Sequence, residues 1–142
     1  ILERQLKPEA RVDIIEKLKT MKIKPSSMID LSDGLSSDIT HICRASNVGV
    51  KIFENKIPIS EETKRTAQEL KINPTISALH GGEDYELLLT ASVKEYKKLK
   101  TIKSIQPIGH ITSEKEKIEL ITASNESIDL TIEGWDSFLK NK

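Results

Sequence analysis

The feature that most constrains the fold is a strand–helix–strand pattern in the first half of the chain. Within residues 34–45, apolar side chains recur at i, i+4, i+7 and i+8, which predicts an amphipathic helix that buries one stripe. The stripe consists of Leu35, Ile39, Ile42 and Cys43. A short apolar run at 28–31 predicts the end of a buried strand before the helix. Alternating apolar residues at 48–52 predict a strand after it.

The same periodicities assign the rest of the chain. We expect further helices at 8–21, 60–70, 75–79 and 93–99, and further strands at 85–90, 108–111, 117–121 and 128–132. The acids Glu61 and Glu62 after Ser60 are typical of a capped helix start. The strand at 85–90 is apolar enough to be central in a sheet. Because helices and strands alternate early and strands cluster late, we predict a single mixed α/β domain, with a mixed sheet packed against helices.

Composition excludes several classes of protein. The 142 residues fit one compact domain, and 22 Lys plus Arg balance 22 Asp plus Glu. A net charge of zero argues against binding to nucleic acid or to a membrane surface. No apolar run approaches the roughly 18 residues of a membrane-spanning helix, and no secretory signal is found. The single Cys43 excludes an internal disulfide and fits the cytoplasm. Since the chain begins at Ile1 without Met, we expect it to be part of a longer protein.

The densest group of chemically active side chains is at residues 30–38. It places two carboxylates, Asp30 and Asp33, between a buried strand end and a helix N-terminus. Mg²⁺ in nucleotide sites is commonly held by one or two carboxylates together with phosphate oxygens. The helix N-terminus adds free N–H groups that suit phosphate, and Gly34 allows the backbone to approach a ligand closely. These residues predict a binding site for Mg²⁺ and phosphate.

A simpler interpretation of this cluster is helix capping. Ser32 or Asp33 would then be the N-cap, and Asp38 a solvated residue of the helix. Capping does not require the second carboxylate, Asp30, at the end of an apolar strand.

A second cluster lies at residues 81–88. Gly81 and Gly82 deliver two acids, Glu83 and Asp84, to the start of the apolar strand, where α/β domains usually place ligand contacts. The alternative is a loop with solvated acids. None of the three histidines has a partner at metal-ligand spacing, so a zinc site is not predicted.

The third feature is Trp135, which is the only tryptophan in the chain and follows Gly134. It is either a core anchor or a lid over a ligand, and an indole face binds cations well. The sequence contains no P-loop, no Gly-x-Ser-x-Gly motif and no paired-cysteine motif. The residues alone therefore indicate an α/β domain with a candidate site for Mg²⁺ and phosphate.

Taken in order, residues 30–38, 81–88 and 134–138 resemble three signatures of the thiamine-monophosphate kinase family. Residues 56–60 and 108–112 are also similar to the family. The resemblance covers essentially the whole chain, as the second half of a two-domain protein. It implies that residues 1–142 are a C-terminal α/β domain of the type found in aminoimidazole ribonucleotide synthetase and selenophosphate synthetase.

The resemblance also implies a reaction and its residues. The family transfers the γ-phosphoryl group of ATP to thiamine monophosphate, giving thiamine diphosphate. By motif position, Asp30 and Asp33 would bind Mg²⁺, and Ser32 would contact ATP. Glu83 would contact the thiamine moiety, and Trp135 would pack on it.

The resemblance further implies what this chain lacks. An N-terminal domain would provide further acidic metal ligands, most ATP contacts and the homodimer interface, so we expect the chain alone to be inactive. Two alternatives remain: a related selenophosphate or aminoimidazole ribonucleotide synthetase, and a non-catalytic ligand-binding domain.

Overall fold

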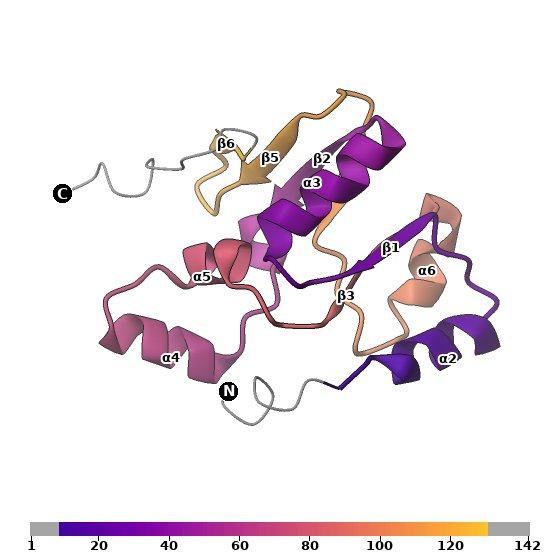
Figure 1. Cartoon of the computed structure of the whole chain (residues 1–142), viewed down its shortest axis with the longest axis horizontal. Helices are drawn as coiled ribbons and strands as arrows, with labels where there is room; N and C mark the ends of the chain where they lie inside the picture. Colours follow the sequence, from indigo (N-terminus) through magenta and orange to yellow (C-terminus); the bar gives the residue numbers. More distant parts are fainter. Residues whose placement is uncertain (1–8, 131–142) are drawn as a thin grey trace.

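The computed structural model describes residues 9–130 of the chain, which form a mixed α/β arrangement (Figure 1). The elements are α2 (Val12–Thr20), β1 (Ser27–Asp30), α3 (Leu35–Ser46), β2 (Gly49–Phe53), the 3-10 helix η1 (Glu54–Lys56), α4 (Glu61–Glu69), α5 (Pro74–His80), β3 (Leu87–Thr90), the 3-10 helix η2 (Val93–Glu95), α6 (Tyr96–Leu99), β4 (Gly109–Thr112), β5 (Ile118–Ile121) and β6 (Ser127–Asp129). Each predicted helix and strand has a counterpart here, with shifted ends. The predicted fold class is confirmed.

The strands form two sheets. A four-stranded mixed sheet has the order β4-β2-β5-β6, in which β2 and β5 are parallel and the other pairs antiparallel. The second sheet is an antiparallel ribbon of β1 and β3, in which Asp30 pairs with Leu87. The prediction that β3 is a central strand is therefore wrong for the part of the chain described, where β3 pairs with β1 alone.

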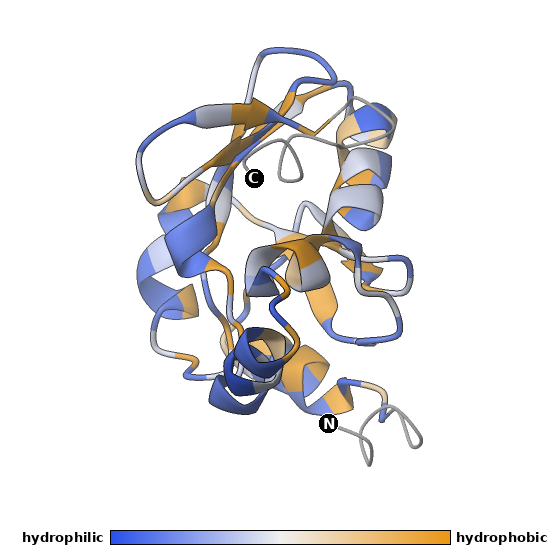
Figure 2. Ribbon diagram, turned by 90° about the vertical axis from the view of Figure 1, so that its left-hand side faces the viewer, coloured by the Kyte–Doolittle hydropathy of each residue, from blue (hydrophilic) through white to orange (hydrophobic). Residues whose placement is uncertain are grey.

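The apolar character of β3 has a different cause, because the β1–β3 ribbon lies between two hydrophobic cores. Leu88 is buried in the larger core, whereas Leu87 and Leu89 pack on the smaller one. The larger core includes the stripe of α3 and the inward residues of β2 and β5: Leu35, Ile39, Ile42, Cys43, Val50, Ile52, Leu79, Leu88, Ile118 and Leu120. The smaller core contains Ile14, Leu18, Ile23, Leu99 and Ile102. Figure 2 shows orange residues along the strands and mostly blue connections between them.

Two helix starts explain how the chain returns from the larger sheet to the ribbon. Ser60 accepts a hydrogen bond from the Thr63 N–H at the start of α4, as the sequence predicted. Asn73 caps α5 in the same way, and Pro74 occupies the first helical position. Together they direct α5 against α3, so that its end delivers the glycine pair to the strand β3. Among residues 9–130, no helix is both long and apolar enough to cross a membrane.

Candidate functional site

The two acidic clusters predicted from the sequence lie against each other. The segment that leaves β1 and the segment that enters β3 are joined by backbone hydrogen bonds, which continue the pairing of the ribbon. Leu31 donates its N–H to the carbonyl of Glu86 at 2.8 Å and accepts from the N–H of Tyr85 at 2.9 Å. The N–H of Glu83 donates to the carbonyl of Ser32 at 2.8 Å. Segments that are far apart in the sequence therefore form one surface at the end of the ribbon.

Gly82 makes this close approach possible, and Gly34 allows the end of α5 to pack against the start of α3. A Cβ atom on Gly82 would lie 2.4 Å from the carbonyl oxygen of Ser32, a distance that no side chain tolerates. A Cβ on Gly34 would lie 2.8 Å from the carbonyl oxygen of Leu79, and Gly34 has a φ of +102°. Of the glycine pair, only Gly82 lies against the first cluster, whereas a Cβ on Gly81 would lie 2.3 Å from the carbonyl oxygen of Ser77 in α5.

The second cluster also has an unusual backbone. Glu83 and Tyr85 have φ values of 66° and 51°, in the left-handed region that residues other than glycine enter at a cost. Alternating left-handed residues turn this segment while its N–H groups stay bonded to the first cluster. The Glu83 side chain is exposed.

Asp30 and Asp33 present free carboxylates on this surface. Both residues are exposed, and within residues 9–130 neither side chain makes a hydrogen bond or an ion pair. Oxygen ligands without a protein partner are what a hard cation such as Mg²⁺ requires. The described residues contain no group of three His, Cys, Asp or Glu side chains placed to hold a metal ion. Both carboxylates are therefore open to a ligand from solvent.

The capping interpretation of the first cluster is wrong. The N-cap of α3 is Gly34, and no side chain caps this helix start. Ser32 lies in the loop before it and holds the second cluster through its backbone. Ser36, in the first turn, donates its hydroxyl to the carbonyl of Leu79 at 2.9 Å and so ties α3 to α5.

Asp38, which capping would leave solvated, is only 1% exposed. Its Oδ2 atom accepts the N–H of Ser32 at 3.0 Å and the N–H of Asp33 at 3.3 Å. Asp38 thus supports the loop from inside. The sequence carried a signal for this, because Asp38 is three residues after Leu35 and four before Ile42, on the buried stripe of the helix.

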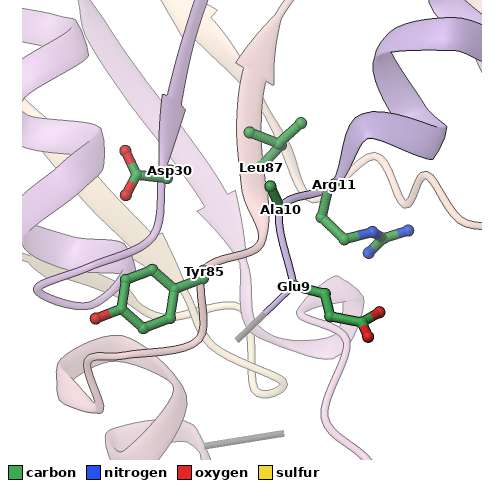
Figure 3. Close-up of a pocket in the computed structure, with 6 residues that line it drawn as sticks. All are labelled: Glu9, Ala10, Arg11, Asp30, Tyr85 and Leu87. Carbon is green, nitrogen blue, oxygen red and sulfur yellow. The ribbon is translucent and has the colours of Figure 1, made fainter. Parts of the chain in front are cut away.

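A cavity of about 350 Å³ opens beside Asp30, at the start of the described chain (Figure 3). It is lined by Glu9, Ala10, Arg11, Asp30, Tyr85 and Leu87. The guanidinium of Arg11 pairs with Glu86 and with Asp13, and hydrogen bonding to Asp13 raises the pKa of Arg11. In Figure 3 the Asp30 carboxylate points away from Arg11. Sequence reasoning missed the Arg11–Glu86 contact, since nothing in either local pattern links α2 to the second cluster.

The sequence-predicted site residues are thus mostly gathered at one place. Asp30, Ser32, Asp33 and Glu83 all belong to the two joined segments. Trp135 lies outside the described residues.

Comparison with known proteins identifies the family. The model of the family "AIR synthase related protein, C-terminal domain" matches residues 3–121. The thiamine-monophosphate kinase of Buchnera aphidicola subsp. Schizaphis graminum is 39% identical over 127 residues, covering 85% of this chain and 38% of the relative. That of Aquifex aeolicus is 40% identical over 90 residues, covering 63% of this chain and 28% of the relative.

A solved structure agrees with these matches. The protein named AaThiL, complexed with AMPPCP and TMP, superposes with a TM-score of 0.73 and 28% identity, over 90% of this chain and 40% of that one. The chain therefore spans less than half of the length of each of these three proteins. Because the family model matches most of the length of this chain, the chain belongs to the AIR synthase related proteins, as their C-terminal domain.

Proposed function

We propose that this chain is the C-terminal domain of a kinase that transfers the γ-phosphoryl group of ATP to thiamine monophosphate. The observation that carries the proposal is the joining of the two acidic clusters, with free carboxylates on Asp30 and Asp33 beside Glu83. The sequence relatives named thiamine-monophosphate kinase, and a structural neighbour complexed with AMPPCP and TMP, support this choice of substrates.

In this proposal, Asp30 and Asp33 hold Mg²⁺ together with phosphate oxygens of the substrates. The bound cation would neutralise charge on the phosphates, which is the main electrostatic requirement of phosphoryl transfer. Ser32 contacts ATP next to the uncapped N-terminus of α3, where free N–H groups favour an anion. No general base is needed, since the accepting phosphate is already an anion.

The thiamine end of the substrate is assigned to Glu83 and Trp135. The thiazolium ring is a cation, which a carboxylate attracts and an aromatic face binds. Glu83 is exposed, and its N–H donates to the carbonyl of Ser32, the neighbour of Asp33.

The rest of the site would come from an N-terminal domain, which in a homodimer would also provide the subunit contact. Because the described residues supply two free carboxylates and no cluster of three metal-binding side chains, we expect the chain alone to show no turnover. Consumption of ATP and the free, buried thiol of Cys43 fit a cytoplasmic enzyme.

The test is a direct assay of the complete protein with ATP, Mg²⁺ and thiamine monophosphate, in which thiamine diphosphate is measured by chromatography. Parallel reactions contain the substrates of selenophosphate synthetase and aminoimidazole ribonucleotide synthetase. The proposal predicts turnover with thiamine monophosphate alone, and turnover only with a synthetase substrate would contradict it.

A matched pair of variants tests the substrate contact in the same assay. Glu83→Gln is expected to raise KM for thiamine monophosphate by about three- to tenfold, because a charge next to the thiazolium is lost. Glu62→Gln, an exposed glutamate on α4, is the control and should leave KM unchanged. Equal KM values for the two variants would remove Glu83 from the site.

A further inference from the structure

We infer that Asp38 is a positioning residue of this site, which fixes the Ser32–Asp33 backbone so that Asp30 and Asp33 are presented to one cation. What the loop binds rests on the proposed function. How the loop is held rests on geometry alone.

The geometry is that of an internal brace. Asp38 lies in α3 and reaches back to the loop before the helix, where one oxygen atom accepts the N–H groups of Ser32 and Asp33 at 3.0 and 3.3 Å. An ionised acceptor strengthens a hydrogen bond, although these two bonds are no shorter than ordinary N–H···O bonds. Asp33 is thereby fixed through its own backbone, while its side chain stays exposed.

A carboxylate at this position is costly unless the loop needs it. Asp38 is 1% exposed on a helix stripe that is otherwise apolar, and within the described residues it has no ion-pair partner. Packing alone would favour leucine or isoleucine there, because an unpaired buried charge is strongly unfavourable. The two loop N–H groups and the positive end of α3 stabilise the charge. The loop conformation thus allows Asp38 to be buried, and the buried Asp38 in turn holds the loop in that conformation.

The charge of Asp38 also acts on the surface above it. Asp30 and Asp33 carry exposed carboxylates a few residues away along the chain, and like charges repel one another. A divalent cation at the surface relieves this repulsion. Asp38 therefore shapes the loop through its hydrogen bonds and adds a negative charge beneath it.

The first measurement is amide hydrogen exchange of residues 30–38 in the complete protein without metal. Asp38→Ala and Asp38→Leu remove the acceptor, and exchange of the Ser32 and Asp33 amides is expected to become about tenfold faster or more. Asp38→Asn keeps an oxygen that accepts both N–H groups, so its exchange should stay within about threefold of wild type. Ile42→Val, on the same stripe, controls for general destabilisation.

Loop exchange as slow as wild type in Asp38→Leu, which fills the apolar stripe, would overturn the inference even if Asp38→Ala failed to fold. A loop loosened equally by Ile42→Val would overturn it too, because the effect would then be a general loss of stability.

The second measurement is the Mg²⁺ concentration that gives half-maximal turnover in the complete protein. Asp38→Leu is expected to raise it by about tenfold, with KM for thiamine monophosphate changed by less than about twofold. Asp38→Asn should fall between Asp38→Leu and wild type, because it restores the hydrogen bonds and lacks the charge. An unchanged Mg²⁺ requirement in Asp38→Leu, beside an active wild type, would overturn the inference alone. An inactive wild type would instead overturn the proposed function, and the exchange data would still decide the role of Asp38.

Discussion

Replacement of Gly34 by alanine tests the close contact between the start of α3 and the end of α5. Gly34 has φ 102° and ψ 156°, a region that is essentially restricted to glycine and costs other residues about 1–3 kcal/mol. The added Cβ would also meet the backbone of Leu79 at 2.8 Å and of His80 at 3.1 Å. Backbone atoms cannot move aside as a side-chain tip can, and overpacking of this kind costs about 1–3 kcal/mol.

The two effects together predict that Gly34→Ala lowers the free energy of unfolding by about 3 kcal/mol, out of the roughly 5–15 kcal/mol of a typical domain. With a urea m-value of about 1.5 kcal/mol/M, the midpoint of urea unfolding should fall by about 2 M. The assay is equilibrium urea unfolding of the chain followed by circular dichroism. Ser46→Ala, an exposed change at the other end of α3, is the control and should shift stability by less than about 0.5 kcal/mol. A Gly34→Ala midpoint within about 0.3 M of wild type would refute the contact geometry.

Two further predictions concern the larger sheet and its neighbours. Hydrogen bonding from Ser127, with help from Lys117 and Lys51, lowers the pKa of Glu119 below its ordinary value of 4.5. The ionised Glu119 therefore stabilises the fold fully above pH 4.5, and this stabilisation is lost as the pH falls through the lowered pKa. Urea unfolding across this acidic range should therefore show a flatter pH dependence for Glu119→Gln, and an equally steep one would contradict the assignment. Glu54 accepts hydrogen bonds from the Thr75 hydroxyl and the Ala123 N–H, each at 2.8 Å, so Glu54→Ala should cost about 1–3 kcal/mol. A double-mutant cycle with Thr75→Val should give a coupling of at least about 0.5 kcal/mol, and strict additivity would argue against the contact.

Local patterns were sufficient to predict most of the secondary structure. The stripe of Leu35, Ile39 and Ile42 fixes α3 because its period matches one helical face, and Ser60 marks the start of α4 through a cap that forms within the same turn. Both signals depend on residues a few positions apart, which a sequence shows directly.

What the sequence could not provide is the set of contacts between distant segments. An apolar run such as Leu87–Thr90 has the same appearance whether strands or two cores cover it, so the position of β3 in a two-stranded ribbon was not predictable. The hydrogen bonds between the two acidic clusters likewise join residues that no local period relates. Asp38 is the intermediate case: its place on an apolar stripe was visible, but the loop that it supports was not.

We propose that the loop carrying Asp33 binds the magnesium ion of a thiamine-monophosphate kinase. The most direct measurement is thiamine diphosphate formation by the complete protein, compared among wild type, Asp33→Asn and Glu69→Gln, the last an exposed acid on α4. All three should unfold at similar temperatures, because the Asp33 side chain makes no hydrogen bond or ion pair within residues 9–130. We predict turnover in wild type and Glu69→Gln, and a loss of at least about a hundredfold in Asp33→Asn. An Asp33→Asn protein with wild-type turnover and an unchanged Mg²⁺ requirement would contradict it.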